Sequence, residues 1–281
     1  MRVLDILCGV GHASAILGVL RPQTEIVMAD SDFVNLSLAR QFLDPRGVLI
    51  CLDAALPLPF VDSSFDGLLC LDGLHYVRPK NSLLREVDRV LNANGVWLFA
   101  HMHNVAGDNA NPGAPLTAEG YATRFAFGQQ RLMSEHEILH QFRTSASLDL
   151  TAPSDVRSLV SSDALTLVGA RAESLWGKHA GLDDALCRYP NLIGFNPLYH
   201  RAESVSDGLM LRSVWPSESL RRECIGTMPV LPECLHVRQH VVDEVAELRA
   251  TGLVSDDVRT LLRSFVLVSL PECYPRTGIP A

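Results

Sequence analysis

Between residues 2 and 100, short apolar runs of strand length alternate with segments of helical period. The apolar runs are 2–6, 25–29, 47–52, 65–71 and 96–100, and the segments 12–20 and 81–91 place apolar residues three and four positions apart. Such alternation is typical of strand–helix–strand units, which build a parallel sheet with helices on both faces. The sequence therefore predicts an α/β fold with a doubly wound, mostly parallel sheet.

Two further features complete the expected sheet. Ser31 is expected to cap a helix whose inward face carries Phe33, Leu36, Ala39, Phe42 and Leu43. The tetrad 92–95 is expected to turn the chain into the strand 96–100. After a Gly-, Asn- and Pro-rich loop at 105–120, a helix at 134–142 and strands at 147–151 and 164–170 would bring the sheet to seven strands. We expect this domain to span residues 1–172.

Residues 173–281 predict a small mixed α/β module of unknown role. A hairpin is expected about Asp207-Gly208, followed by helices that begin at 216 and 240. Ser255 is expected to cap a last helix that runs to residue 265. The sequence does not indicate an oligomeric state.

Composition narrows the function classes. A net charge of -8 and a pI near 5.7 argue against nucleic acid as a partner. No uncharged apolar run approaches the ~20 residues that span a bilayer, and residues 1–11 lack the pattern of a secretory signal. We therefore expect no membrane partner and a cytoplasmic location. The seven cysteines are scattered and never in CxxC spacing, so they indicate neither a disulfide framework nor a zinc site.

Small and acidic residues follow the first three strands. Gly9 and Gly11 lie in the first strand-to-helix turn, where glycine lets backbone approach a ligand. Asp30 ends the second strand, at a position where a carboxylate can accept the hydroxyls of a ribose. Asp53 follows the third strand, within reach of an adenine amino group. The alternatives are that the glycines serve packing, that Asp30 caps the next helix and that Asp53 is a turn residue.

Four motifs in order resemble the type 11 family of class I S-adenosylmethionine-dependent methyltransferases. They are VLDILCGVGHAS, ADSD, LDAALPLPFVDSSFDGLLCLDGLHYV and LLREVDRVLNANGVWLF. The resemblance covers residues 2–104 well and 132–172 in outline, and it implies a Rossmann-like methyltransferase fold with S-adenosylmethionine as the cofactor. The cofactor residues it implies are Asp5, Leu7, Cys8, Gly9, Gly11, Asp30, Ser31, Asp53, Ala54, Asp72, Gly73 and Leu74.

The sequence departs from the family at two places. Leu7 stands where the family usually has its first glycine, so the side chain is expected to narrow the cofactor turn. The family also places helices before the first strand, whereas here that strand begins at residue 2. Either Met1 is an internal methionine of a longer translation product, or another segment covers the cofactor crevice. For that cover we expect the 105–120 loop and part of residues 173–281. The alternative is that the C-terminal module is an independent domain that binds a partner or forms a dimer.

Methyl transfer from a sulfonium is an in-line displacement, so alignment of the two substrates supplies much of the catalysis and a base is optional. The candidate catalytic bases are His75, His101 and His103, which follow the fourth and fifth strands at the ligand edge of the sheet. The alternative for each histidine is a structural or substrate-contact role. Because no third ligand accompanies His101 and His103 in the sequence, we predict no metal.

The predicted reaction is methylation of a small-molecule acceptor, at oxygen, nitrogen or carbon. Two alternatives stay open. One is a macromolecule methyltransferase in which residues 173–281 dock the substrate. The other is a degenerate methyltransferase fold that acts as a non-catalytic partner subunit, which the presence of Leu7 motivates.

Overall fold

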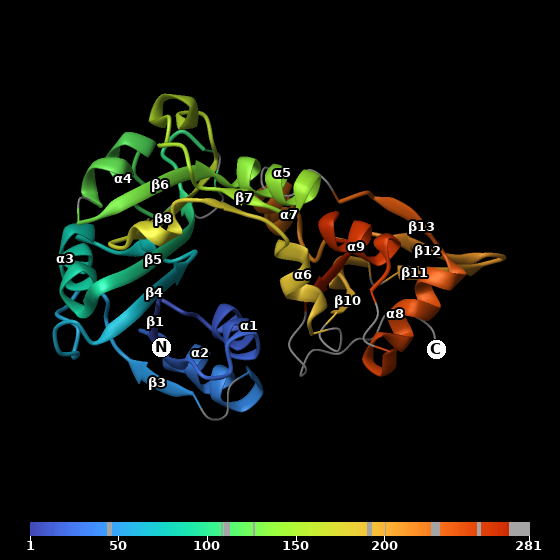
Figure 1. Cartoon of the computed structure of the whole chain (residues 1–281), viewed down its shortest axis with the longest axis horizontal. Coiled ribbons are helices and arrows are strands. Elements are labelled where there is room, and N and C mark those ends of the chain that lie inside the picture. The colour runs from blue at the N-terminus through green and yellow to red at the C-terminus, as the bar shows by residue number, and fades with distance from the viewer. Residues whose placement is uncertain are drawn as a thin grey trace. The chain divides into compact units, whose positions relative to one another are not determined.

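The computed structural model describes residues 1–281 apart from 44–46, 108, 110–112, 126, 190–192, 200, 226–230, 252–253 and 270–281. Contacts divide the chain into two compact units (Figure 1). The first unit comprises Met1–Ile138 and Asp149–Lys178, and the second comprises Leu139–Leu148 and His179–Ala281. That residues 1–172 fold as a separate domain stays a prediction.

The first unit is built on a seven-stranded sheet. Its strand order is β3-β2-β1-β4-β5-β8-β6. The strands are β1 (Arg2–Ile6), β2 (Glu25–Asp30), β3 (Val48–Cys51), β4 (Phe65–Leu71), β5 (Leu91–His103), β6 (Gln129–Ser134) and β8 (Ala164–Ala170). The five strands from β3 to β5 are parallel, and β8 pairs antiparallel with both β5 and β6. The predicted doubly wound, mostly parallel sheet is confirmed.

Helices cover both faces of this sheet. They are α1 (His12–Leu20), α2 (Phe33–Leu38), α3 (Lys80–Val90) and α4 (Ala118–Arg124), and α5 (Glu135–Ser145) follows β6. Leu4 and Ile6 of β1 share a buried apolar cluster with Leu83 of α3 and Tyr121 of α4. Successive side chains of a strand point to opposite faces, so Asp5 faces the other side, where it meets Ser14 of α1. Parallel strands buried on both faces explain the nearly continuous apolar runs in the sequence.

The identity of the seventh strand was predicted wrongly. Residues 147–151 contribute only the two-residue strand β7 (Leu148–Asp149), which lies outside the seven-stranded sheet. The place is taken by β6, whose sequence QQRLMS carries few β-branched or aromatic residues and therefore gives little strand signal. Residues 92–95 are also not a turn before the strand, because β5 runs without a break from Leu91 and absorbs them through a register shift against β4.

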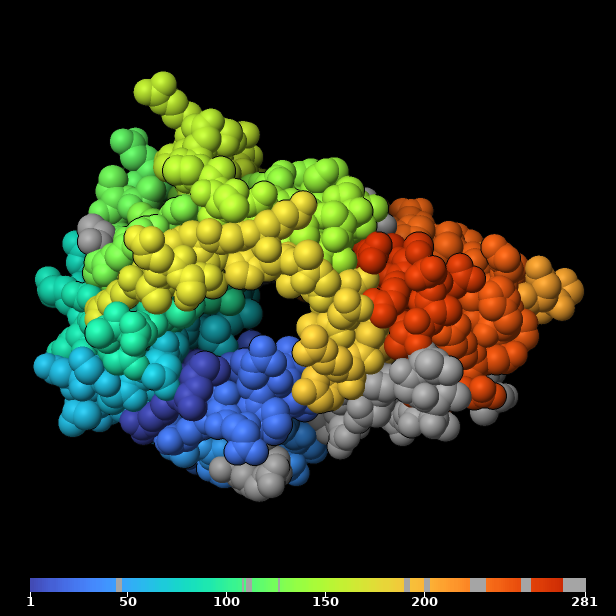
Figure 2. Space-filling model, in the orientation of Figure 1, coloured from blue at the N-terminus to red at the C-terminus, as the bar shows by residue number. Residues whose placement is uncertain are grey.

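The helix after β2 also differs from its prediction. Asp32, not Ser31, caps it by accepting a hydrogen bond from the Val34 amide. Leu36 and Ala39 are buried as expected, but Phe33 is 70% exposed and Phe42 is 52% exposed. The inward stripe is narrower than expected because the chain changes to a π-helix at Ala39–Leu43, which has a different number of residues per turn. The N-terminal part of the chain, drawn in blue, forms a continuous part of the first unit's surface in Figure 2.

The second unit is small and mixed α/β, as predicted. Its antiparallel sheets are β10-β14 and β11-β12-β13. The elements are α6 (Leu182–Cys187), β10 (Ile193–Phe195), β11 (Arg201–Val205), β12 (Gly208–Arg212), α7 (Glu218–Ile225), β13 (Cys234–Arg238), α8 (Gln239–Thr251), α9 (Asp256–Arg263) and β14 (Leu267–Ser269). The hairpin turns at 206–207, and Ser255 caps α9 by accepting from the Val258 amide. Both features match the sequence prediction.

An ion-paired carboxylate lies in the interior of the second unit. Asp183 on α6 is 2% exposed and accepts two hydrogen bonds from Arg263 on α9, at 2.9 and 2.6 Å. The neighbouring Arg259 lies 3.6 Å from the same carboxylate. A buried carboxylate is tolerated only when it is paired in this way. Among the described helices of both units, none is long and apolar enough to cross a membrane.

Candidate active site

The loops that follow β1, β2, β3, β4 and β5 meet at one edge of the first unit's sheet. In an open α/β sheet, ligands bind outside the carboxyl ends of the strands at the point where the strand order reverses. Here the reversal lies between β1 and β4. On one side of it the strand order runs β1-β2-β3, and on the other side it runs β4-β5. The predicted site residues occupy this edge.

The turn after β1 is held in left-handed backbone conformations. Leu7 has φ 59°, Gly9 has φ 54° and Gly11 has φ 80°. A side chain on Gly11 would lie 2.7 Å from the sulfur of Met28, so only glycine fits there. Leu7, by contrast, bears the cost of a left-handed conformation, which is roughly 1–2 kcal/mol for a residue with a Cβ. Gly11 precedes α1 without a side-chain cap, and therefore leaves amides at the helix start for a ligand.

The side chain of Asp5 contacts the helix that follows this turn. Its carboxylate is 1% exposed and accepts a 2.6 Å hydrogen bond from the Ser14 hydroxyl of α1. Burial raises the pKa of Asp5 to about 7, although the Ser14 hydrogen bond opposes the shift. The side chain faces α1, so Asp5 positions the turn through the helix that the turn leads into.

Asp30 joins the first two loops. One carboxylate oxygen accepts from the Gly9 amide at 2.8 Å, and the other accepts from the Asp32 amide at 2.8 Å. The carboxylate therefore fixes the glycine turn to the end of β2. This contact was not expected from the sequence, and it gives Asp30 a structural role beside the predicted ribose contact, which stays a prediction.

Asp53 lies one strand further along the same edge. It is exposed, and one carboxylate oxygen accepts from the Ala55 amide at 2.8 Å. The neighbouring Ala54 is 3% exposed and belongs to the apolar core. Ser31 accepts a weak contact from the Cys51 thiol at 3.6 Å. The turn contact of Asp53 agrees with its alternative interpretation, and its predicted contact with adenine stays a prediction.

Leu7 and Gly73 are in direct contact across the reversal point. A Cβ atom on Gly73 would lie 2.5 Å from the Cβ of Leu7, so position 73 has room only for glycine. Leu74, the next predicted cofactor residue, is 1% exposed and packs into the core. The Leu7 side chain thus occupies space between the turn after β1 and the loop after β4, as its departure from the family pattern predicts.

The three candidate histidines gather with Asp72 at the carboxyl ends of β4 and β5. His75 follows β4, whereas His101 and His103 lie within the end of β5, which continues past the predicted strand 96–100. The rings of His75 and His103 stack with centroids 3.7 Å apart, and the ring of His101 meets His103 edge-on at 5.4 Å. A carboxylate oxygen of Asp72 lies 3.6 Å from Nε2 of His75 and 3.8 Å from Nε2 of His103. The sequence prediction had placed these residues near one another, but not in ring contact.

The environments of these histidines differ. His75 is 0% exposed, and burial, together with His103, His101 and Lys80, lowers its pKa to about 3. His75 is therefore neutral at pH 7 and a weak base. His101 is partly exposed, and its Nδ1 lies 2.9 Å from a carboxylate oxygen of Glu135. A carboxylate on one ring nitrogen fixes the tautomer and makes the other nitrogen more basic.

Two residues at this edge were missed by the sequence analysis. Glu135 begins α5, and its pairing with a histidine 34 positions away leaves no sequence signal. Lys80 is buried and donates to the backbone oxygens of His75, Val77 and Ala114 at 3.3, 3.0 and 2.6 Å. Because the Ala114 amide also donates to the His75 oxygen at 2.7 Å, the described end of the 105–120 loop lies against the histidine cluster. That this loop covers the cofactor crevice stays a prediction.

The sheet order, the glycine turn and the acidic residues after β2 and β3 define the class of domain. Residues 4–99 match the family model described as Methyltransferase domain. Together they show that residues 4–99 belong to a class I S-adenosylmethionine-dependent methyltransferase domain of the type 11 family.

Two curated relatives and one solved structure illustrate the similarity. The ubiquinone/menaquinone biosynthesis C-methyltransferase UbiE of Stenotrophomonas maltophilia is 34% identical over 116 residues, covering 40% of this chain and 46% of that protein. The malonyl-acyl-carrier-protein O-methyltransferase of Legionella pneumophila is 32% identical over 99 residues, covering 35% of each. The chain thus spans less than half the length of these relatives.

The solved structure is a phosphoethanolamine N-methyltransferase 2 of Haemonchus contortus, in complex with phosphomonomethylethanolamine and S-adenosylhomocysteine. It is 14% identical and has a TM-score of 0.46, over 60% of this chain and 48% of that one.

Proposed function

We propose that the whole chain transfers a methyl group from S-adenosylmethionine to a small-molecule acceptor. The observation that carries the proposal is that two groups of residues lie at the same edge of the sheet. The turn from Leu7 to Gly11 is tied to Asp30 by the Gly9 hydrogen bond, and the histidine cluster lies at the carboxyl ends of the adjacent strands β4 and β5. The first group binds the cofactor, and the second faces the acceptor.

The cofactor contacts follow from the backbone. The amides at the start of α1 receive the carboxylate end of the cofactor, because helix N-termini favour anions. Asp30 holds the ribose, and Asp53 with Ala54 lies beside the adenine. Asp72, Gly73 and Leu74 then line the floor near the sulfonium methyl group.

The histidines serve the acceptor. In the reaction the bond from sulfur to the methyl carbon breaks, the acceptor lone pair forms the new bond, and the sulfonium becomes a neutral thioether. An acceptor hydroxyl also loses a proton. His101, with Glu135 on Nδ1, is better suited to receive it than His75, whose pKa is near 3.

The relatives support a small acceptor only by their names, which describe methylation at carbon in one case and at oxygen in the other. The atom methylated by this chain is therefore left open, and its cytoplasmic location stays a prediction. A macromolecular acceptor has no feature of the described residues in its favour.

Calorimetric titration of the full chain with S-adenosylmethionine tests the proposal. We expect one cofactor per chain and competition by S-adenosylhomocysteine. Methyl transfer is then measured with radiolabelled cofactor against hydroxylated aromatic and acyl acceptors. A folded protein that binds no cofactor at millimolar concentration contradicts the proposal and favours a non-catalytic partner role.

A further inference from the structure

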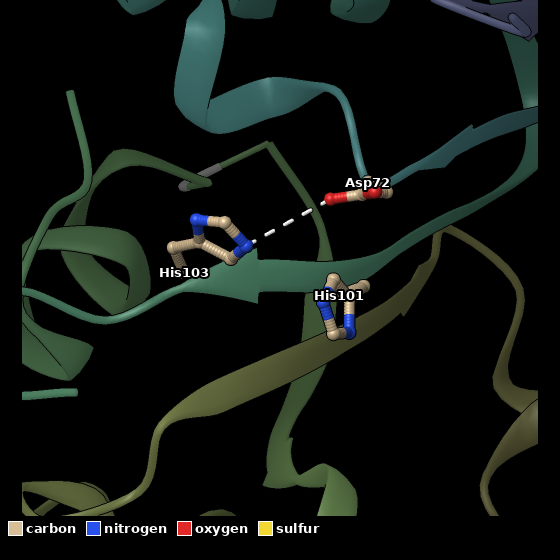
Figure 3. Close-up of side chains that lie close together, drawn as sticks. All are labelled: Asp72, His101 and His103. Atoms are coloured by element: carbon tan, nitrogen blue, oxygen red, sulfur yellow. Dashed lines mark ion pairs between the residues drawn. The ribbon is translucent and has the colours of Figure 1, made fainter. Parts of the chain in front are cut away.

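Asp72, His101 and His103 offer three metal-ligand atoms to one point in space. The atoms all lie within 4.8 Å of one another. Figure 3 shows the carboxylate of Asp72, at the end of β4, directed toward the ring of His103, with the ring of His101 on the neighbouring strand β5 close by. The sequence showed no third ligand near the two histidines, because Asp72 lies 29 residues before His101 and only the fold brings it close.

The backbone departs from regular strand geometry to bring these side chains together. Asp72 has φ 57° and His101 has φ 52°, both in the left-handed region. Between Phe99 and Met102 the pairing of β5 with β8 shifts register, so His101 sits in a bulge. Left-handed residues outside glycine and bulges beside strand ends cost free energy, and they concentrate at functional sites where they direct a side chain.

A second group of contacts fixes the orientation of the two histidine rings. Glu135 accepts from Nδ1 of His101 at 2.9 Å and lies 3.5 Å from the hydroxyl of Thr166. Metal-binding histidines usually donate their second ring nitrogen to a carboxylate, which fixes the tautomer and presents the first nitrogen to the ion. The fully buried ring of His103 is held by its stack on His75. Nε2 of His103 lies 3.8 Å from Asp72, and the ligand atom that His101 offers lies within 4.8 Å of both.

We propose that Asp72, His101 and His103 bind a divalent transition-metal ion. Two imidazoles and one carboxylate suit zinc, iron and related ions, and three protein ligands leave coordination positions open. Metal–ligand bonds of ~2.1 Å place neighbouring ligand atoms about 3.0–3.5 Å apart. The Nε2 of His103 and the nearer oxygen of Asp72 are 3.8 Å apart, and all three ligand atoms lie within 4.8 Å of one another, so metal binding would draw the three side chains closer together.

The role of the ion rests on the proposed function. An acceptor hydroxyl bound at an open position becomes more acidic, as metal-bound water does. Because His101 is a ligand when the ion is bound, the proton passes to water instead of to His101. The resulting oxygen anion takes the methyl group from the sulfonium, and S-adenosylhomocysteine leaves as a thioether. This selects an acceptor with an oxygen that can ligate a metal, such as a catechol or an enol.

Metal binding is tested on the full chain without reference to turnover. The protein is treated with a chelator, dialysed and titrated with Zn²⁺ by calorimetry at pH 7. We expect one site per chain. Asp72→Asn is the key variant, because asparagine tolerates the left-handed backbone and the side chain is exposed. It should weaken Zn²⁺ binding at least ~10-fold, and His101→Ala and His103→Ala should do the same.

Two variants distinguish specific Zn²⁺ binding at this site from incidental binding elsewhere on the protein. Glu135→Gln keeps a hydrogen-bond acceptor for His101 but removes the charge, and should weaken Zn²⁺ binding by ~10-fold. His140→Ala removes an exposed histidine of α5 outside the cluster and should leave the affinity unchanged. Circular dichroism confirms that each variant is folded.

The results that overturn the metal site differ from those that overturn the proposed function. No Zn²⁺ binding below 1 mM by the wild-type chain, or equal binding by wild type, Asp72→Asn and His101→Ala, overturns the metal site. Cofactor binding is measured on the same metal-free sample. Cofactor binding without Zn²⁺ binding leaves the proposed function standing alone, and Zn²⁺ binding without cofactor binding leaves the metal site standing alone.

Discussion

The Cβ atom of Leu7 lies only 2.5 Å from the position that a Cβ atom on residue 73 would occupy. Gly73→Ala should therefore lower the free energy of unfolding by roughly 1–3 kcal/mol, as overpacking does. Urea denaturation measures the loss. In the Leu7→Gly background the same change should cost much less, and an undiminished cost would show that another neighbour causes the clash.

Leu7→Gly should tighten cofactor binding several-fold. The change removes a side chain from the cofactor turn and relieves a left-handed conformation at φ 59°. Calorimetry with S-adenosylmethionine measures the affinity, and Leu7→Ala is the matched control because it retains a Cβ. Equal affinity in wild type and Leu7→Gly would show that the side chain lies clear of the bound cofactor.

Asp30→Ala should weaken cofactor binding by about 10-fold or more without unfolding the protein. A hydrogen bond from a ribose hydroxyl to a carboxylate contributes ~1.5–3 kcal/mol, and the Gly9 amide loses its acceptor as well. Asp32→Ala is the control, because it removes a nearby carboxylate that caps α2. If both variants bind the cofactor as wild type does, Asp30 is outside the site.

His101→Ala or His103→Ala should reduce turnover by ~100-fold or more while cofactor affinity stays nearly intact. Both side chains lie at the end of β5, on the acceptor side of the proposed site, and His101 is supported by Glu135. Single-turnover rates with labelled cofactor give the effect, and His140→Ala serves as the reference. Full activity in both variants would make alignment of the substrates the whole mechanism.

Asp5 should make stability depend on pH. Its folded pKa is raised from 3.8 to about 7, so the protonated carboxyl is favoured in the folded state. The contribution of the protonated carboxyl to the free energy of unfolding is complete below pH 3.8. It is lost as the pH rises toward 7, by at most ~1.4 kcal/mol per pH unit. The difference in unfolding free energy between wild type and Asp5→Asn, measured from pH 4.5 to 7.5, isolates this effect. A difference that does not change with pH contradicts it.

The sheet could be predicted from the sequence because both of its faces are buried. The apolar runs around Leu4, Val27 and Leu68 follow directly from that burial. The edge strand β6 lacks this signal, and its pairing with β8 joins residues 31 to 41 positions apart in the chain. The exposure of Phe33 likewise could not be predicted, since helical period identifies an apolar stripe but not what covers it.

The candidate site was predicted in part. Asp30, Asp53 and Asp72 were identified because their positions relative to the strand ends are local information. The contact of Asp30 with Gly9, and that of His101 with Glu135, join distant segments and leave no local pattern. The metal ligand Asp72 was found in the sequence but given another role, because its proximity to His103 exists only in the folded chain.

The buried carboxylate of Asp183 limits how the second unit can be shortened. Its arginine partners, Arg259 and Arg263, both lie on α9, close to the end of the described chain. A protein truncated before α9 would retain a charged group in its interior with neither cation to compensate it, at a cost of about 3–5 kcal/mol. Nonsense or frameshift alleles that remove only this last tenth of the chain are therefore expected to behave as loss-of-folding alleles of the whole second unit.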